Sequence, residues 1–253
     1  MQLNEVKAVI TGGASGLGLA AAERLLAAGA SVTLLDVNQA AGDEQAARLG
    51  VSYVHADVTN EDAIAAALLH AQTNMGGLNL AINCAGVLGA GRVLGRDAPM
   101  PLKNFAQTVM INLVGSFNVG KAAANLMAGN APGLDNERGL IVNTASIAAY
   151  EGQIGQAAYA ASKGGVVGMT LPMAREFARI GVRVMTIAPG VFHTPMVDGM
   201  PPAVYDSLCA QVPFPSRLGS AAEFADAVCF IVTNRYMNGG TIRIDGAIRL
   251  QPK

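Results

Sequence analysis

Short runs rich in apolar and β-branched residues alternate with longer Ala-rich segments along almost the whole chain. The short runs predict strands at residues 7–11, 31–36, 52–55, 80–83, 139–144, 183–188 and 241–244. The longer segments predict helices at residues 16–28, 39–49, 61–73, 103–127, 156–179 and 221–232. Strand-like runs such as 140–142 are apolar without alternation, which is typical of a parallel sheet covered on both faces.

This order of elements predicts an α/β fold of the doubly wound type. Its seven-stranded parallel sheet would be joined by right-handed crossovers and covered by helices on both faces. The length of 253 residues suits one domain that spans residues 1–253. With 51% hydrophobic and 14% charged residues, the chain can fill a large core.

Charge and hydropathy narrow the partners that we expect. The formal net charge is −1 and no block of like charges occurs, so we expect no binding to nucleic acid or to a membrane surface. Apolar stretches are interrupted well before the roughly 20 residues that a membrane span needs. The strand-like run at residues 6–11 follows Met1 closely, so we expect no signal peptide.

Cysteines and histidines are few and scattered: Cys84, Cys209, Cys229, His55, His70 and His193. An odd number of cysteines without a CxxC pair is typical of a reducing compartment, so we expect a cytoplasmic protein without disulfides. The histidines have no ligand spacing and no neighbouring carboxylates, so we expect no metal site.

Two Pro- and Gly-bearing or Met-rich stretches interrupt the alternation, at residues 87–101 and 191–215. Both follow the carboxyl ends of predicted strands, where ligands bind in open α/β sheets. We therefore interpret both as substrate-binding loops.

A glycine-rich turn follows the first predicted strand and opens a helix. It contains Gly12, Ser15, Gly16, Leu17 and Gly18. Glycines there permit a tight turn and let backbone N–H groups approach a pyrophosphate at the helix N-terminus. Alone, the string is also typical of an ordinary turn with a small-residue cap. Its place between a strand and a helix favours a Rossmann-type dinucleotide site.

Asp36 ends the second predicted strand. Its carboxylate can accept hydrogen bonds from ribose hydroxyls and would repel a 2′-phosphate, which favours NAD over NADP. Asp57 and Val58 follow the third strand and can meet the adenine edge. An alternative for Asp57 is that it caps the next helix.

Tyr159 and Lys163 are four residues apart in a predicted helix, so their side chains share one face. A free tyrosine has a pKa of about 10, and a neighbouring ammonium lowers it toward neutrality. Ser146, at the end of the fifth strand, offers a hydroxyl to a substrate oxygen. A Tyr–Lys pair alone is more often an accident of the surface, so its weight depends on the other motifs.

Together these motifs resemble the short-chain dehydrogenase/reductase family over nearly the full length. The matching segments are residues 11–18, 83–86, 111–113, 146, 159–163, 189–190 and 194. The resemblance implies that Tyr159 is the general acid/base, that Lys163 binds the nicotinamide ribose and lowers the tyrosine pKa, and that Ser146 orients the carbonyl. It implies that Asn112 holds a water in a proton relay. It also implies that the cofactor site includes Asn83, Ala85, Gly86, Pro189, Gly190 and Thr194.

One branch of that family looks closer still, the type II 3-hydroxyacyl-CoA dehydrogenases. Residues 143–159, 183–190, 211–219 and 245–249 carry this likeness, and residues 87–101 lie where the branch has an extra loop. The resemblance implies oxidation of the 3-hydroxyl of acyl-CoA thioesters with NAD, possible use of hydroxysteroids, and a homotetramer. Helices 103–127 and 156–179 would pack across a two-fold axis of that tetramer.

Several residues near these motifs have two readings. Gln153 can donate to the thioester or keto oxygen, or it is a plain loop-capping amide. Arg92, Arg96 and Lys103 either contact CoA phosphates or form a solvated face. His193 either touches substrate or lies in solvent, and Met196, Met200 and Leu208 either line an acyl site or pack the loop.

Three functions remain open on the sequence. The first is an NAD-dependent oxidoreductase that interconverts a secondary alcohol and a ketone, such as 3-hydroxyacyl-CoA and 3-oxoacyl-CoA or a hydroxysteroid pair. The second is a 3-oxoacyl-carrier-protein reductase, which usually prefers NADPH, so Asp36 argues against it. The third is an NAD-binding scaffold, against which the complete set of Asn112, Ser146, Tyr159 and Lys163 argues.

Overall fold

A seven-stranded, all-parallel sheet forms the centre of the computed structural model, which describes residues 1–194 and 202–252. The strand order is β3-β2-β1-β4-β5-β6-β9. The strands are β1 Lys7–Thr11, β2 Ser31–Asp36, β3 Ser52–His55, β4 Leu80–Asn83, β5 Gly139–Thr144, β6 Val182–Pro189 and β9 Thr241–Ile244. Six of them have the predicted bounds, and β6 extends one residue further at each end. The predicted doubly wound α/β fold is confirmed.

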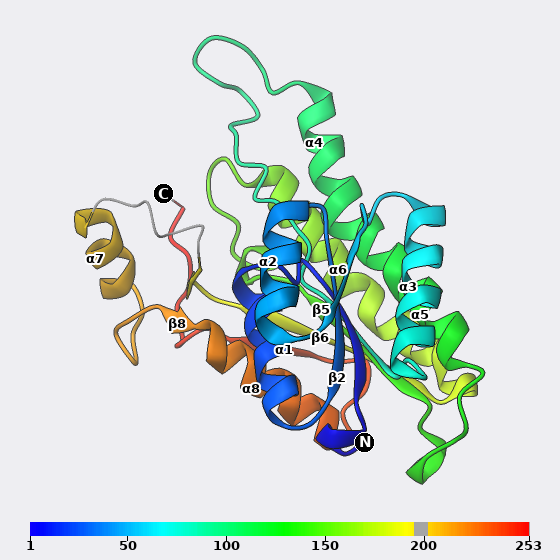
Figure 1. Cartoon of the computed structure of the whole chain (residues 1–253). Coiled ribbons are helices and arrows are strands. Elements are labelled where there is room, and N and C mark those ends of the chain that lie inside the picture. The colour runs from blue at the N-terminus through cyan, green and yellow to red at the C-terminus, as the bar shows by residue number, and fades with distance from the viewer. Residues whose placement is uncertain (195–201, 253) are drawn as a thin grey trace.

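Helices cover both faces of this sheet (Figure 1). One face carries α1 Gly16–Ala27, α2 Gln39–Leu49 and α8 Ala221–Thr233, and the other carries α3 Glu61–Met75, α5 Gly115–Met127 and α6 Ala157–Phe177. Successive strand residues point to opposite faces, so Ile10 lies in the core below α1 and α8 while Val9 lies in the core below α3 and α5. Both side chains are fully buried. Two dry cores therefore hold the sheet in place and fix the positions of its ends.

The predicted helix 103–127 is not uniform. It consists of α4 Leu102–Val109, a π-helical turn η2 Met110–Val114, and α5. A π turn inserts an extra residue into an α-helix and is frequent at functional sites. The turn contains Asn112, one of the predicted catalytic residues. Apolar periodicity cannot reveal such a turn, because the residues on both sides of it still read as a helix.

The two interruptions of the pattern differ in structure. Residues 87–101 form an exposed loop whose only isolated bridge among the described residues joins Leu94 and Pro99. The second stretch contains a short strand β7 Phe192–His193, which pairs with β8 Gly219–Ser220, and a helix α7 Pro202–Ala210 that the sequence did not predict. Proline is compatible with the first position of a helix, so a proline-rich composition hid this element. Short 3₁₀ turns lie at Leu3–Glu5, Leu134–Asn136, Ile147–Ala149 and Ala178–Ile180.

Within residues 1–194 and 202–252, no helix has the length and apolar character needed to cross a bilayer. The same residues contain no group of three or more His, Cys, Asp or Glu side chains that is arranged to hold a metal ion. Cys84, Cys209 and Cys229 are all free thiols.

Candidate active site

The glycine turn between β1 and α1 is as tight as its sequence predicts. Gly12 has a φ of +62°, and a Cβ added there would lie 2.8 Å from the Ala85 backbone nitrogen. A Cβ on Gly18 would collide with the Gly12 carbonyl oxygen. Only glycine fits these two positions, since any side chain would push the turn away from the end of β4.

The first turn of α1 keeps its backbone donors available. Ser15 is the N-cap of the helix, but its side chain makes no capping hydrogen bond. The first N–H groups of a helix have no partner within the helix, and together with the helix dipole they attract an anion. Ser15, Gly16 and Leu17 therefore form a cradle that fits a pyrophosphate.

Asp36 is held beside this turn by two backbone donors. The Ala14 nitrogen donates to Asp36 Oδ2 at 3.1 Å, and the Asn38 nitrogen donates to Oδ1 at 3.0 Å. Each carboxylate oxygen keeps a further lone pair for a ligand. The half-buried carboxylate is thus fixed at the carboxyl end of β2, where ribose hydroxyls would be recognised.

Asp57 does not cap α3, so that reading of the sequence is wrong. The N-cap is Asn60, whose side chain accepts from the Ala63 nitrogen at 3.0 Å. Asp57 Oδ1 instead accepts from the nitrogen and hydroxyl of Thr59, at 2.9 and 2.8 Å. The exposed Asp57 therefore orders the turn that precedes the helix, beside the buried Val58.

The end of β4 meets the glycine turn, but the Asn83 side chain points away from it. Asn83 is 2% exposed and donates to Asn143 Oδ1 at 2.8 Å and to the Ser116 carbonyl at 3.2 Å. Its amide is thus used inside the sheet, where Asn83 and Asn143 are register partners. Ala85 and Gly86 are the parts of this segment that face the site.

Asn112 connects three segments of the site through its side chain. Its Nδ2 donates to the Val87 carbonyl at 2.9 Å and to Ser162 Oγ at 3.0 Å, and its Oδ1 accepts from the Val87 nitrogen at 2.8 Å. Ser162 in turn donates to the Tyr159 carbonyl at 2.8 Å. Asn112 is fully buried, so this bridge holds the start of loop 87–101 against the helix that carries Tyr159.

Lys163 and Tyr159 lie together as their spacing predicts. Lys163 Nζ is 5.8 Å from the centre of the Tyr159 ring and donates to the Thr144 carbonyl at 2.7 Å. A Cβ added to Gly86 would lie 3.6 Å from the same nitrogen, so the absence of a side chain at Gly86 leaves space beside the ammonium. Lys163 is 5% exposed, and burial lowers its pKa to about 8.

The phenol of Tyr159 is governed mainly by burial. Burial raises its pKa, and a hydrogen bond with Ser146 lowers it by a smaller amount. The expected lowering by Lys163 is therefore not the dominant effect in this structure. Ser146 is itself the N-cap of the turn Ile147–Ala149, where its Oγ accepts from the Ala148 nitrogen at 3.1 Å. The phenol stays protonated at neutral pH, which suits a proton donor.

Sequence reasoning missed Ser162, Thr144 and Cys84 at this site. Ser162 and Thr144 hold Asn112 and Lys163, and their place within the motifs at 159–163 and 143–146 was the available signal. The Cys84 thiol lies 3.4 Å from Thr144 Oγ1, and burial raises its pKa to about 11. The thiol is therefore neutral and serves as a small packing group below the glycine turn.

The residues for which the sequence allowed two interpretations lie in different surroundings. Gln153 Nε2 donates to the Gln251 carbonyl at 3.0 Å, so this amide is engaged as a tether. His193 packs edge-to-face on Tyr205 of α7, with ring centres 6.0 Å apart. Thr194 ends the described part of its loop. Arg92, Arg96 and Lys103 are exposed, Leu208 is half-buried in α7, and Met196 and Met200 lie outside the described residues.

Pro189 and Gly190 complete the edge of the sheet. The Gly190 nitrogen donates to the Ile244 carbonyl at 2.9 Å, and a Cβ on Gly190 would lie 2.8 Å from the Asp245 Cα. The phosphate cradle follows β1 and the Ser146 hydroxyl follows β5. The Lys163 ammonium of α6 meets the end of β5, so these groups and the Tyr159 phenol lie at one edge of the sheet.

Comparisons with known proteins agree with this arrangement. A family model described as short chain dehydrogenase matches residues 6–203. The chain belongs to the short-chain dehydrogenase family. The resemblance drawn from the motifs is confirmed, and the chain is an oxidoreductase of this family.

Named relatives of this short-chain dehydrogenase are similar over almost their whole length. The 3-hydroxyacyl-CoA dehydrogenase type-2 of Bos taurus is 51% identical over 249 residues, which cover 97% of this chain and 95% of the bovine protein. The Homo sapiens protein of the same name is 52% identical with the same coverage. The crystal structure of 3-hydroxyacyl-CoA dehydrogenase type-2 from Mycobacterium avium has a TM-score of 0.96 and 42% identity, and covers 100% of this chain and 99% of that one. The carrier-protein reductase and scaffold hypotheses are not favoured.

Proposed function

We propose that this dehydrogenase interconverts 3-hydroxyacyl-CoA and 3-oxoacyl-CoA with NAD, and that it also accepts hydroxysteroids. The observation that carries the proposal is the Tyr159 phenol, whose ring centre lies 5.8 Å from the buried Lys163 ammonium and whose pKa the Ser146 hydroxyl lowers. The names of the relatives support the acyl-CoA class of substrate.

The side chains divide the chemistry between them. In the reductive direction, Tyr159 Oη donates its proton to the substrate carbonyl oxygen, and Ser146 Oγ donates a second hydrogen bond to that oxygen. The Lys163 ammonium stabilises the phenolate that remains, and Asn112 fixes the helix on which both residues lie. Oxidation reverses these proton movements. Bound cofactor would supply the hydride chemistry at C4 of its nicotinamide ring: NADH would donate a hydride to the carbonyl carbon in reduction, and NAD would accept it back in oxidation.

We assign residues 1–253 to one Rossmann-type domain, and we propose that this domain binds NAD. Gly12, Ser15, Gly16, Leu17 and Gly18 would hold the pyrophosphate, and Asp36 the adenosine ribose. The remaining positions would be Asp57 and Val58 at the adenine, Asn83, Ala85 and Gly86 along the floor, and Tyr159, Lys163, Pro189, Gly190 and Thr194 around the nicotinamide. The Asn83 side chain would act there only from inside the sheet.

Comparing NAD with NADP tests the Asp36 assignment. We expect wild type to prefer NAD strongly, and Asp36→Asn to narrow the preference by about tenfold or more, because like charges then no longer face each other. Asp62→Asn, which changes an exposed carboxylate of α3 outside the proposed cofactor site, is the matched control and should leave the preference for NAD over NADP unchanged. Comparable use of both cofactors by wild type would remove the case for Asp36.

We also propose a homotetramer in the cytoplasm. Large apolar side chains at least 36% exposed follow α4, η2 and α5: Leu102, Phe105, Met110, Val114 and Phe117. Several large exposed apolar side chains along one run of helix are typical of subunit contacts. On α6, a Cβ on Gly168 would meet nothing within 4 Å, so this glycine leaves room for a neighbouring helix, whereas one on Gly165 would contact Leu113 of the same chain. Light scattering at micromolar concentration should give four times the chain mass, and a monomer would contradict the proposal.

The activity itself is tested by NAD reduction with 3-hydroxyacyl-CoA esters of several lengths and with hydroxysteroids. Tyr159→Phe should lower turnover by about 10²–10³, because it removes the proton donor and one hydrogen bond to the reacting oxygen. Tyr236→Phe is the matched control, since Tyr236 is fully exposed. Turnover that survives Tyr159→Phe would show that the mechanism is wrong.

A further inference from the structure

Four charged side chains form a cluster that joins the segment before α6 to the end of the chain. Arg243, on β9, makes a two-point ion pair with Glu151, at 2.8 and 3.0 Å. Its Nε also donates to Asp245 Oδ2 at 2.8 Å, and Arg249 Nη1 donates to the same oxygen at 3.0 Å. Two acidic and two basic groups therefore neutralise one another in a closed network.

This network is better shielded than an ordinary surface ion pair. Arg243 and Glu151 are each 24% exposed at the side chain, and Asp245 is 10% exposed. The Arg243 guanidinium also lies over the Tyr150 ring, 5.1 Å from its centre. Two-point geometry combined with partial burial makes the contact both strong and directional.

The residues after β9, 246–252, form a C-terminal arm that runs along the same segment. The Ile154 nitrogen donates to the Pro252 carbonyl at 3.0 Å, and Gln153 Nε2 donates to the Gln251 carbonyl at 3.0 Å. Ile248 is fully buried in a small apolar cluster with Ile147 and Val212. Figure 1 shows the red end of the chain beside the light-green stretch that leads into α6.

Along the chain, the segment held by these contacts, residues 147–156, separates the two residues that supply the hydroxyls of the catalytic site. Ser146 precedes it and Tyr159 follows it by a few residues. On its other side, the Gly91 nitrogen donates to the Gly155 carbonyl at 2.8 Å, so loop 87–101 also leans on it. A shift of residues 147–156 would therefore change the surroundings of Ser146, Tyr159 and loop 87–101, and it would leave the glycine turn in place.

We propose that Arg243 is a positioning residue that acts through Glu151, and that the C-terminal arm with segment 147–156 forms a wall that sets affinity for the acyl substrate. This inference rests on the proposed function. Among the described residues, the contacts of Arg243 and Glu151 include neither the glycine turn nor Asp36. The Arg243–Glu151 pair should therefore act on substrate affinity and leave NADH affinity unchanged.

The kinetic test uses the full chain with Arg243→Gln, Glu151→Gln and the double variant, assayed as NADH-dependent reduction of a 3-oxoacyl-CoA. Each single change should raise KM by about tenfold through loss of a charged hydrogen-bond pair, with kcat within about twofold of wild type. If Arg243 acts through Glu151, the double variant should be no worse than the single ones. Arg24→Gln, which removes the exposed Arg24–Asp226 pair between α1 and α8, is the control and should change nothing.

Hydrogen exchange and NADH fluorescence titration complete the test without an acyl substrate. Exchange should rise in residues 147–156 of Glu151→Gln, a near-isosteric change chosen in case Arg243→Gln folds poorly, while the NADH Kd stays constant. Unchanged exchange in that segment, an unchanged KM, or an equal loss of NADH affinity would each overturn the proposal. If wild type reduced no 3-oxoacyl-CoA, the proposed function would be contradicted instead. Hydrogen exchange would then still test whether the Arg243–Glu151 pair holds residues 147–156 in place.

Discussion

Two buried cations lie at opposite ends of the central sheet, and the protein treats them in opposite ways. Arg183 is at the amino end of β6 and is 7% exposed, whereas Lys163 lies at the carboxyl end of β5 and is 5% exposed. Their burial is thus nearly equal. What differs is the number and kind of groups that each one meets.

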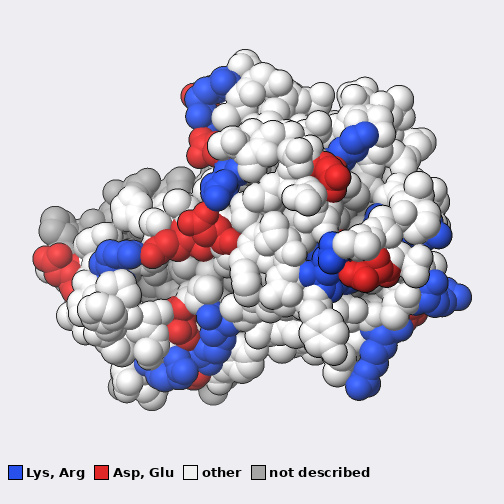
Figure 2. Space-filling model, turned by 90° about the horizontal axis from the view of Figure 1, so that it is seen from below, with Lys and Arg blue, Asp and Glu red and all other residues white. Residues whose placement is uncertain are grey.

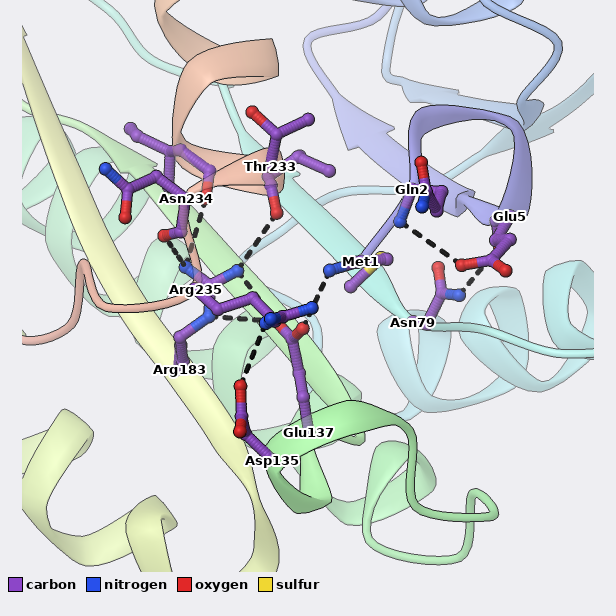
Figure 3. Close-up of polar contacts among 12 residues, drawn as sticks. Met1, Gln2, Glu5, Asn79, Asp135, Glu137, Arg183, Thr233, Asn234 and Arg235 are labelled. Atoms are coloured by element: carbon purple, nitrogen blue, oxygen red, sulfur yellow. Dashed lines mark hydrogen bonds and ion pairs between the residues drawn. The ribbon is translucent and has the colours of Figure 1, made fainter.

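Arg183 has an ionic partner and several carbonyl acceptors. It pairs with Glu137 at 2.7 Å (Figure 3). It also donates to the carbonyls of Ile231 and Met237 at 3.0 and 2.9 Å. These carbonyls lie at and after the C-terminal end of α8, where a cation also meets the negative end of the helix dipole. Figure 2 shows this end of the molecule, where acidic and basic side chains lie largely next to one another.

Lys163 has the Thr144 carbonyl, and no carboxylate pairs with it among the described residues. Its pKa of about 8 is the consequence, because burial without an opposite charge disfavours the ammonium. The Arg183 charge is therefore used fully to stabilise the fold, whereas the Lys163 charge is incompletely satisfied and remains available for chemistry. Sites of function are often maintained at such a cost in stability.

Lys163→Met is the most direct test of the difference between the two buried cations. Turnover should fall by about 10²–10⁴, since the group that supports the Tyr159 phenolate is lost. The urea midpoint should change little, because removal of a poorly satisfied charge offsets the lost hydrogen bond to Thr144. Steady-state kinetics and urea unfolding measure both. A variant that keeps near-normal turnover, or one that unfolds readily, would end the distinction between the two cations.

Arg183→Met should give the converse result. Glu137 would remain buried and keep the Met1 ammonium at 3.0 Å, so the free energy of unfolding should fall by about 3 kcal/mol, the lower end for a broken buried pair. Turnover per folded molecule should remain as in wild type, because the change lies at the far end of the sheet. Adding Glu137→Leu should recover part of the loss. If Arg183→Met instead left stability intact, the network in Figure 3 would contribute little.

A pH series separates the two roles more gently. Lys163 is charged below its pKa of about 8, so reductive kcat/KM should fall toward tenfold for each pH unit above that value. Its contribution to stability has the opposite sign. Between pH 8 or so and the ordinary lysine pKa of 10.5, the unfolded chain binds more protons than the folded chain, so folding becomes more favourable as pH rises. Both trends should be absent from Lys163→Met, and flat wild-type kinetics from pH 7 to 9.5 would contradict the assigned pKa.

The smallest effect is expected from an exposed ion pair. Glu61 contacts Lys121 on the surface between α3 and α5, with side chains 73% and 45% exposed. Solvent screens such pairs, so Glu61→Gln should leave the urea midpoint and turnover within experimental error. A clear loss of stability would show that burial is not what distinguishes Arg183 from the surface pairs.

The sheet could be predicted almost residue by residue, because strands buried on both faces are continuous apolar runs with few alternatives. Tyr159, Lys163 and Ser146 could be found because each sits in a short local motif. The π turn at Asn112, the helix α7 and the inward Asn83 side chain could not be found in this way. The π turn still reads as a helix, and the proline-rich composition hid α7. The orientation of Asn83 depends on Asn143, which lies on a neighbouring strand 60 positions further along the chain.

By itself, the sequence determined the order of strands and helices, the glycine turn and the residues that can move a proton. Only the tertiary structure decided how those groups behave. Burial without a carboxylate lowers the pKa of Lys163, and Arg243 meets Glu151 across 92 positions of the chain. Periodicity and local motifs record near neighbours, whereas desolvation and ion pairing depend on groups that only the folded chain brings together.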